Sequence, residues 1–178
     1  MTDPSEQSLW RPLRLLLDAM DADIARVYAE AQVDELKPAW VMELLRLQAH
    51  GPMTIAELAR SVQRTHSAMS QKVAAMRAAG WVRTRPGADA RSKQVALTPK
   101  AMRILPLLTA EWRATEASIV EIEAEIPYPL SRVVTDITAA LARESFHDRI
   151  SQKLRNNPNW DHGGVGGETG AARGPGEG

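Results

Sequence analysis

The sequence of 178 residues contains no cysteine, so disulfide bonds and thiol-based redox sensing are both excluded. It also lacks a run of about 18 apolar residues, and its first residues are polar and acidic rather than those of a secretory signal peptide. These absences predict a cytoplasmic protein that does not span a membrane. The length suits one domain with a tail and is sufficient to bury a hydrophobic core.

Sequence signatures of catalysis are also missing. The four histidines, at positions 50, 66, 147 and 162, are scattered, and the chain has neither an HExxH motif nor a glycine-rich phosphate loop. We therefore expect no enzymatic activity, no cofactor and no bound metal. The sequence allows one possible metal site, formed by His147, Asp148 and Glu144, but such residues are far more often ordinary positions of a surface helix.

The net charge is zero, which alone argues against nucleic-acid binding, but the charges are unevenly distributed along the chain. Residues 60–103 carry ten Lys and Arg against a single acid, Asp89. Residues 1–59 and 104–178 each carry an excess of acids. A basic segment in an otherwise acidic chain is typical of a surface that contacts phosphates. The alternative is a solvated basic surface without a ligand.

Two short helices joined by a turn are predicted around the start of the basic segment. Thr54 and Glu57 form a T-x-x-E capping box that begins the first helix. Thr65 is a suitable N-cap for the second helix, and Gly80 stands where a C′ glycine ends it.

The second of these helices has two chemically different faces. Met69, Val73 and Met76 recur at helical spacing and predict a buried face. The opposite face carries polar or small side chains, namely His66, Ser67, Ser70, Gln71 and Ala74.

A two-stranded ribbon is predicted after Gly80, where the apolar period changes from helical to alternating. Residues 81–85 and 94–97 form its strands, and Met53 can add a short strand beside them. The tip presents four ionisable side chains: Arg85, Asp89, Arg91 and Lys93. Two helices followed by a basic ribbon make a winged helix-turn-helix, whose second helix enters a DNA major groove while the ribbon reaches the adjacent backbone or minor groove.

This segment resembles the DNA-binding half of the multiple-antibiotic-resistance regulator (MarR) family. The resemblance lies in S-x-x-S-Q-K-V at 67–73, M-R-x-x-G-W-V-R at 76–83, and D-A-R-S-K-Q-V-A-L-T-P-K at 89–100. Ala101 departs from the family, which usually has glycine there, and this concerns the start of the next helix rather than the DNA contact. With the flanking helices, which match only in pattern, the resemblance covers residues 8–152.

Long helices are predicted on both sides of this segment, at residues 5–32, 99–125 and 130–154. Pro12 places the start of the first regular helix near Arg11. An a/d-like apolar stripe follows that helix: Leu9, Leu13, Leu16, Met20, Ile24, Val27 and Ala31. Such stripes exceed what one small domain covers, and the resemblance implies that the terminal helices of two partners interlock. We expect a homodimer; a helical bundle that closes on itself is the alternative.

The fold class expected is therefore mainly α with a small β-wing: a winged helix-turn-helix flanked by long N- and C-terminal dimerisation helices. We expect an N-terminal dimerisation helix at 1–37, a DNA-binding domain at 38–98 and C-terminal dimerisation helices at 99–155. Residues 156–178 hold 8 of the 11 glycines and are expected to be a disordered tail.

A two-fold dimer places two copies of the 65–79 helix about 34–36 Å apart, so the predicted target is a pseudo-palindrome. Base edges are expected to be read by Ser67, Ser70 and Gln71. Contacts with the phosphate backbone are expected from Arg64, Thr65, His66, Lys72, Arg85 and Lys93. Arg91 is the candidate minor-groove residue, with Asp89 orienting its guanidinium.

The resemblance further implies a repressor whose DNA affinity is set by a small phenolic or other amphipathic effector, with no ligand residue identifiable from the sequence. An activator is one alternative. Another is a winged helix that binds a protein and not DNA, which would require an apolar or acidic recognition face. The polar face of the second helix and its basic surroundings favour DNA.

Overall fold

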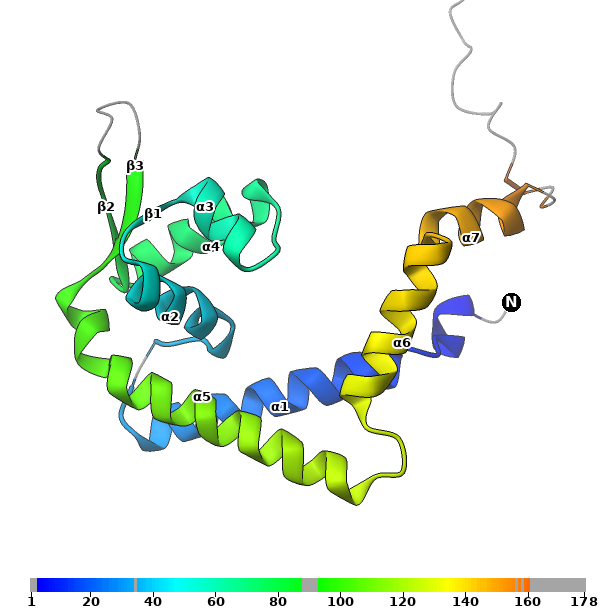
Figure 1. Ribbon diagram of the computed structural model, residues 1–178, viewed down its shortest axis with the longest axis horizontal. Coiled ribbons are helices and arrows are strands. Elements are labelled where there is room, and N and C mark those ends of the chain that lie inside the picture. The colour runs from blue at the N-terminus through cyan, green and yellow to red at the C-terminus, as the bar shows by residue number, and fades with distance from the viewer. Residues whose placement is uncertain (1–2, 34, 88–92, 156, 158, 161–178) are drawn as a thin grey trace, which may run out of the picture. The chain divides into compact units, whose positions relative to one another are not determined.

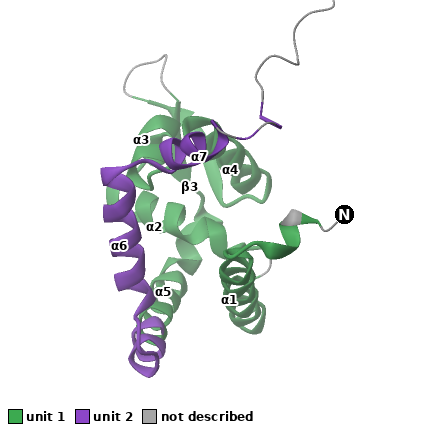
Figure 2. Cartoon of the chain, turned by 90° about the vertical axis from the view of Figure 1, so that its right-hand side faces the viewer, with its two compact units in different colours: residues 1–118 green, residues 119–178 purple. Residues whose placement is uncertain are grey.

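A computed structural model describes residues 3–33, 35–87, 93–155, 157 and 159–160, and it is mainly helical with one small antiparallel sheet (Figure 1). This confirms the predicted fold class. The chain divides into two compact units, Met1–Ser118 and Ile119–Gly178 (Figure 2). No helix in the described part is long and apolar enough to cross a membrane. Most of the tail predicted at 156–178 lies outside the described residues.

The winged helix-turn-helix lies in the first unit and has the predicted order of elements. Its helices are α2 (Val41–His50), α3 (Ile55–Ser61) and α4 (His66–Ala78), and a short 3-10 helix, η2 (Pro38–Trp40), leads into α2. The strands β1 (Met53–Thr54), β2 (Val82–Pro86) and β3 (Lys93–Leu97) form a sheet of order β1-β3-β2. Met53 pairs with Val95, and Val82 pairs with Leu97, so the predicted short strand at Met53 is confirmed.

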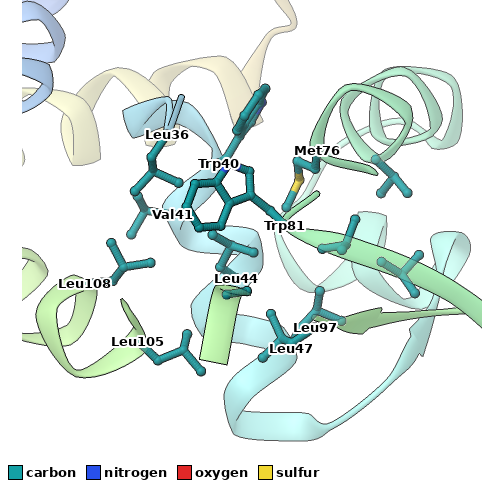
Figure 3. Packing of buried hydrophobic residues seen from close by; sticks show 14 of the residues in the cluster. Leu36, Trp40, Val41, Leu44, Leu47, Met76, Trp81, Leu97, Leu105 and Leu108 are labelled. Atoms are coloured by element: carbon teal, nitrogen blue, oxygen red, sulfur yellow. The ribbon is translucent and has the colours of Figure 1, made fainter. Parts of the chain in front are cut away.

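The core of this unit is an apolar cluster that joins α2, α4, the sheet and the first half of α5 (Pro99–Glu125) (Figure 3). Trp81 lies within it with 2% of its surface exposed, next to Trp40 and Leu44. Leu105 and Leu108 bring α5 into the same cluster. Burying a large apolar side chain contributes about 1.5–3 kcal/mol, so the cluster holds these elements as one body.

The start of α5 is fastened to the end of α4. The Thr98 hydroxyl donates to the Gly80 carbonyl at 2.7 Å and accepts from the Ala101 amide at 3.2 Å. The Lys100 ammonium donates to the Ala79 carbonyl at 3.0 Å and lies 4.1 Å from the centre of the Trp81 ring. Ala101 is fully buried in an ordinary helical turn, so the sequence's departure from glycine at this position is accommodated.

The first long helix is shorter than predicted. α1 (Arg11–Glu30) begins at Arg11, which confirms the start predicted from Pro12, and Pro4–Gln7 forms a separate 3-10 helix, η1, where the helix expected at residues 5–32 had its first turns. The local cause is a cap: the Asp3 carboxylate accepts from the Ser5 amide at 2.8 Å and begins η1. α1 ends before Gln32, whose positive φ of 55° is incompatible with a continuing helix.

Tyr28 is the residue that attaches α1 to α5. It is the one buried residue of α1, with 1% of its surface exposed, and its hydroxyl donates to the Glu111 carboxylate. The other carboxylate oxygen of Glu111 accepts from Thr115 at 2.6 Å. Burial, followed by the bond to Glu111 and its negative charge, raises the pKa of the Tyr28 phenol.

The last predicted helix is two helices. α6 (Leu130–Arg143) ends before Glu144, which is extended, and α7 (Phe146–Leu154) begins after Ser145. Ser145 caps α7, because its hydroxyl accepts from the Asp148 amide at 3.1 Å. The continuous helix expected at 130–154 is therefore wrong. Apolar residues keep a helical spacing throughout this segment, but the Ser-x-x-Asp cap at Ser145 divides the helix in two. Neither α6 nor α7 has a buried residue.

Candidate nucleic-acid interface

The N-terminus of α4 is built by the predicted cap. The Thr65 hydroxyl accepts from the Ala68 amide at 3.2 Å. The turn before it contains no glycine; Gln63 supplies the left-handed conformation instead, with φ of 53°. The capping box of α3 is confirmed too, with Thr54 and Glu57 each accepting a backbone hydrogen bond from the other, at 3.2 and 2.8 Å.

The orientation of α4 follows from its buried side. Met69 and Met76 are fully buried and Val73 is 5% exposed, so this face packs against the core as predicted. Ser70 is half-buried at the edge of the opposite face. The other polar or small positions of that face are exposed: His66, Ser67, Gln71 and Ala74. The structure therefore presents together the side chains that the sequence proposed as base readers.

The ribbon places two of the predicted cations on the surface. Arg85 pairs across the strands with Gln94, and its guanidinium donates to the Gln94 side chain at 3.4 Å. Lys93 is exposed at the start of β3. Asp89 and Arg91, the other two predicted residues of the tip, lie outside the described residues.

A groove runs between α4 and the ribbon, and it brings several of the predicted residues together. Ser70 and Ala74 line it from α4, and Arg85 and Lys93 line it from the ribbon. Arg77 and Thr84 line the same groove, and neither is among the DNA contacts predicted from the sequence. The signal for Arg77 was available in its spacing, because it follows Ser70 by seven residues, or two helical turns.

Two further residues that were predicted to contact phosphates lie at the N-terminal end of α4. Arg64 and Thr65 are exposed, next to the helix end where unpaired backbone amides favour anions. With His66 they form the start of the same exposed face. We refer to this face, together with Ser67, Ser70, Gln71, Arg77, Arg85 and Lys93, as the basic face.

Lys72 does not lie on the basic face. Its ammonium is 2.7 Å from a carboxylate oxygen of Glu43 and 2.8 Å from the Ala39 carbonyl, and its side chain is 24% exposed. The expected phosphate contact of Lys72 is therefore replaced by contacts inside the protein, because the residue emerges on the flank of α4 that faces α2.

The metal site considered from the sequence, at Glu144, His147 and Asp148, would lie at the start of α7. The His147 ring lies 3.3 Å from the Asp148 carboxylate, whereas Glu144 pairs with Arg149 at 3.3 Å. Within the described residues, no three His, Asp or Glu side chains converge in a way that could hold a metal ion.

The arrangement of these elements can be compared with that of known proteins. Residues 35–92 match the model of the MarR family. The transcriptional regulator MosR of Mycobacterium tuberculosis, in complex with DNA, shares 23% identity over 78% of this chain and 99% of its own, with a TM-score of 0.56. The MepR–DNA complex of Staphylococcus aureus shares 16% identity over 78% and 97%, with a TM-score of 0.57.

A MarR protein from Peptoclostridium difficile shares 17% identity over 80% of this chain and 91% of its own, with a TM-score of 0.53. A comparison with curated proteins gives no match. At these identities the likeness to the solved structures concerns the fold. The segment matched by the family model holds α2, α3, α4 and β2, the elements that carry most of the basic face. The chain therefore shares its fold with these solved proteins, and its residues 35–92 match the model of the MarR family.

Proposed function

We propose that this protein is a sequence-specific DNA-binding transcriptional regulator that holds double-stranded DNA on its basic face. The observation that carries the proposal is the groove in which Ser70 and Arg77 of α4 face Arg85 and Lys93 of the ribbon. A helix with a polar exposed face beside a cationic ribbon fits a major groove flanked by phosphates.

The roles proposed for the residues follow from their positions. Ser67, Ser70 and Gln71 read base edges, since a Gln amide can pair with adenine through two hydrogen bonds. The phosphate contacts come from the start of α4, from its last turn and from the ribbon: Arg64, Thr65, His66, Arg77, Arg85 and Lys93. Arg91 enters the minor groove with Asp89 orienting it, a role that rests on the sequence alone.

We further propose that the regulator is a homodimer. α1 is a helix of 20 residues with one buried side chain, and large apolar residues on it are open, including Leu16 at 52% and Val27 at 50% exposure. α6 has no buried residue at all, and Val134 on it is 52% exposed. A second copy of the chain supplies the same apolar faces and can bury them. Dimerisation would pair two α4 helices with two half-sites of a pseudo-palindromic operator.

We also propose that the protein is a repressor that responds to a small ligand and has no catalytic activity. It rests on the shared fold of MarR-family regulators and on the polar, cationic character of the basic face. A small phenolic or other amphipathic effector would lower the DNA affinity, which a reporter assay and a binding titration with such compounds can test.

The experiment that tests DNA binding is a gel-shift titration in rising salt. Binding through phosphates weakens with a log–log slope of about 0.9 per contact. We expect a steep slope for the wild-type chain and weaker binding to all sequences for Arg91→Ala. An affinity independent of salt would refute the proposed interface, and an Arg91→Ala variant with unchanged affinity and slope would refute the role given to the ribbon tip.

A further inference from the structure

Inside the winged helix, α4 is held to α2 by an ion pair whose carboxylate, on Glu43, is buried and whose ammonium, on Lys72, is partly buried. Glu43 is 1% exposed and is the one buried charged residue in the described part of the chain. One of its carboxylate oxygens accepts from the Lys72 ammonium at 2.7 Å. The same ammonium donates to the Ala39 carbonyl at 2.8 Å, at the entry to α2. Residues 29 positions apart in sequence thus link the candidate recognition helix to the helix beneath it.

Stability alone does not account for this pair. Moving the Glu43 carboxylate out of water and partly burying the Lys72 ammonium is costly, and apolar residues of similar volume often hold two helices as well or better. The contacts of Glu43 compensate this cost only in part, because its second carboxylate oxygen has no hydrogen-bond partner among the described residues. An apolar pair would also match the surroundings, where Leu44, Met69 and Met76 are all fully buried.

The ion pair adds a geometric restraint that apolar packing lacks. Apolar contacts depend on area and tolerate sliding and rotation of a helix, whereas a short charge-assisted hydrogen bond is restricted in distance and angle. Lys72 directly follows Gln71, and successive residues turn by about 100° around a helix. Met69, Val73 and Met76 set which side of α4 faces the core, and the contacts of Lys72 with Glu43 and Ala39 fix the rotation more closely. They thereby fix how α4 presents Gln71 and Ser70.

We propose that Glu43 and Lys72 are positioning residues that set the rotation of α4 for DNA recognition, without contacting DNA themselves. This rests on the proposed DNA-binding function. It predicts that stability and DNA affinity can be separated: an apolar replacement of both residues can keep the fold stable but leaves the rotation of α4 under-determined.

The test uses the full chain with three variants: Lys72→Met, the double variant Glu43→Leu/Lys72→Met, and Lys72→Arg. Lys72→Met should lower the urea midpoint, because it leaves the Glu43 charge buried without its partner. The double variant should return the urea midpoint to that of the wild type. Its affinity for a selected DNA site should nevertheless fall by about tenfold. Lys72→Arg, which retains a donor for Glu43, should keep most of the affinity.

Two further readouts separate positioning from other roles. The salt slope of the double variant should equal that of the wild type, because no phosphate contact is removed; a slope lowered by about 0.9 would instead make Lys72 a phosphate ligand and overturn the proposal. Amide hydrogen exchange in α4 should be faster in the double variant than in the wild type. That measurement needs no DNA, so it still tests the inference if the wild-type chain does not bind DNA and the proposed function fails.

The matched control is the double variant Asp23→Asn/Arg26→Gln, which removes an exposed ion pair of 2.8 Å from α1. It should leave affinity and exchange in α4 unchanged. A Glu43→Leu/Lys72→Met variant with wild-type affinity, or with wild-type exchange in α4, overturns the proposal. Failure of the double variant to regain the wild-type urea midpoint overturns it as well, since the pair would then be needed for the fold itself.

Discussion

At the scale of single residues, local chemistry was predictable and distant partners were not. The caps at Thr54 and Thr65 and the C′ position of Gly80, with φ of 75°, depend on neighbours within a few residues, and all are confirmed. Lys72 was expected to meet phosphate because a sequence shows its charge but not its partner. The partner, Glu43, comes from another helix and is visible only once α2 and α4 are packed together.

Gln71 provides a test of base reading. Gln71→Ala should change which sites the protein prefers, because the loss of a bidentate contact costs about 1–3 kcal/mol at the base concerned and little elsewhere. Competition gel shifts with single-base variants of a selected site measure this. Ala74→Ser, on the same face of α4, is the matched control for a change of surface polarity. Uniform weakening on all sites by Gln71→Ala would mean that this residue does not read bases.

Tyr28 provides a test of pH dependence. Burial and the Glu111 contact raise the pKa of the phenol above its ordinary value of 10.0, so the folded chain holds this proton more tightly than the unfolded chain does. The resulting stability is fully present below pH 10.0 and is lost as the pH rises beyond it. Urea unfolding between pH 8 and pH 11 should show this loss for the wild type.

Tyr28→Phe is the comparison for that experiment. At neutral pH it should lower the free energy of unfolding by about 1 kcal/mol, because the bond to Glu111 disappears. Above pH 10.0 it should lose less stability than the wild type does, since the titrating group is gone. Parallel pH profiles for the two proteins would show that Tyr28 does not titrate in the way proposed.

At the scale of elements, periodicity located the helices and strands but not every boundary. The change from helical to alternating spacing after Gly80 placed the ribbon correctly, and the register Val82 with Leu97 agrees with it. The break between α6 and α7 was missed because apolar residues keep a helical spacing across it. The Ser145 cap, which ends that continuity, is a local signal that the sequence contains.

The groove between α4 and the ribbon makes a prediction for Arg77. Arg77→Gln should weaken binding to all sequences and lower the salt slope by about 0.9, because one phosphate contact is lost. Arg132→Gln, which removes the same charge from the exposed face of α6, should change neither quantity. Salt titrations of both variants measure the difference. An Arg77→Gln slope equal to that of the wild type would place phosphate contacts elsewhere than in the groove.

At the scale of the whole molecule, the sequence shows how charged and apolar residues are distributed along the chain. The structure shows how much of the apolar surface a single chain buries by itself. The basic segment, residues 60–103, includes α4, β2 and β3, the elements that carry the basic face. The predicted stripe is only partly buried within the chain: Leu16 and Val27 on α1 are half exposed, and Leu9, which precedes α1, is 91% exposed. We propose that a second copy of the chain covers this stripe and that the long helices are the dimerisation regions.

Leu16→Glu tests the dimer. A charge in an apolar interface is costly to bury, so the dimer dissociation constant should rise at least about tenfold. The isolated chain should lose little stability, because Leu16 is 52% exposed within it. Ala22→Glu, on the opposite and exposed face of α1, should leave the dimer intact. Sedimentation velocity over a range of concentrations measures both. A wild-type protein that is monomeric at micromolar concentrations would contradict the proposed dimer.

The central claim is that a dimer of this chain reads DNA through two copies of α4. Selection of bound sites from random double-stranded DNA tests it most directly. We expect an enriched pseudo-palindrome whose half-sites are centred about 10 base pairs apart. Recovery of no enriched sequence, or of a single site without two-fold symmetry, would contradict it.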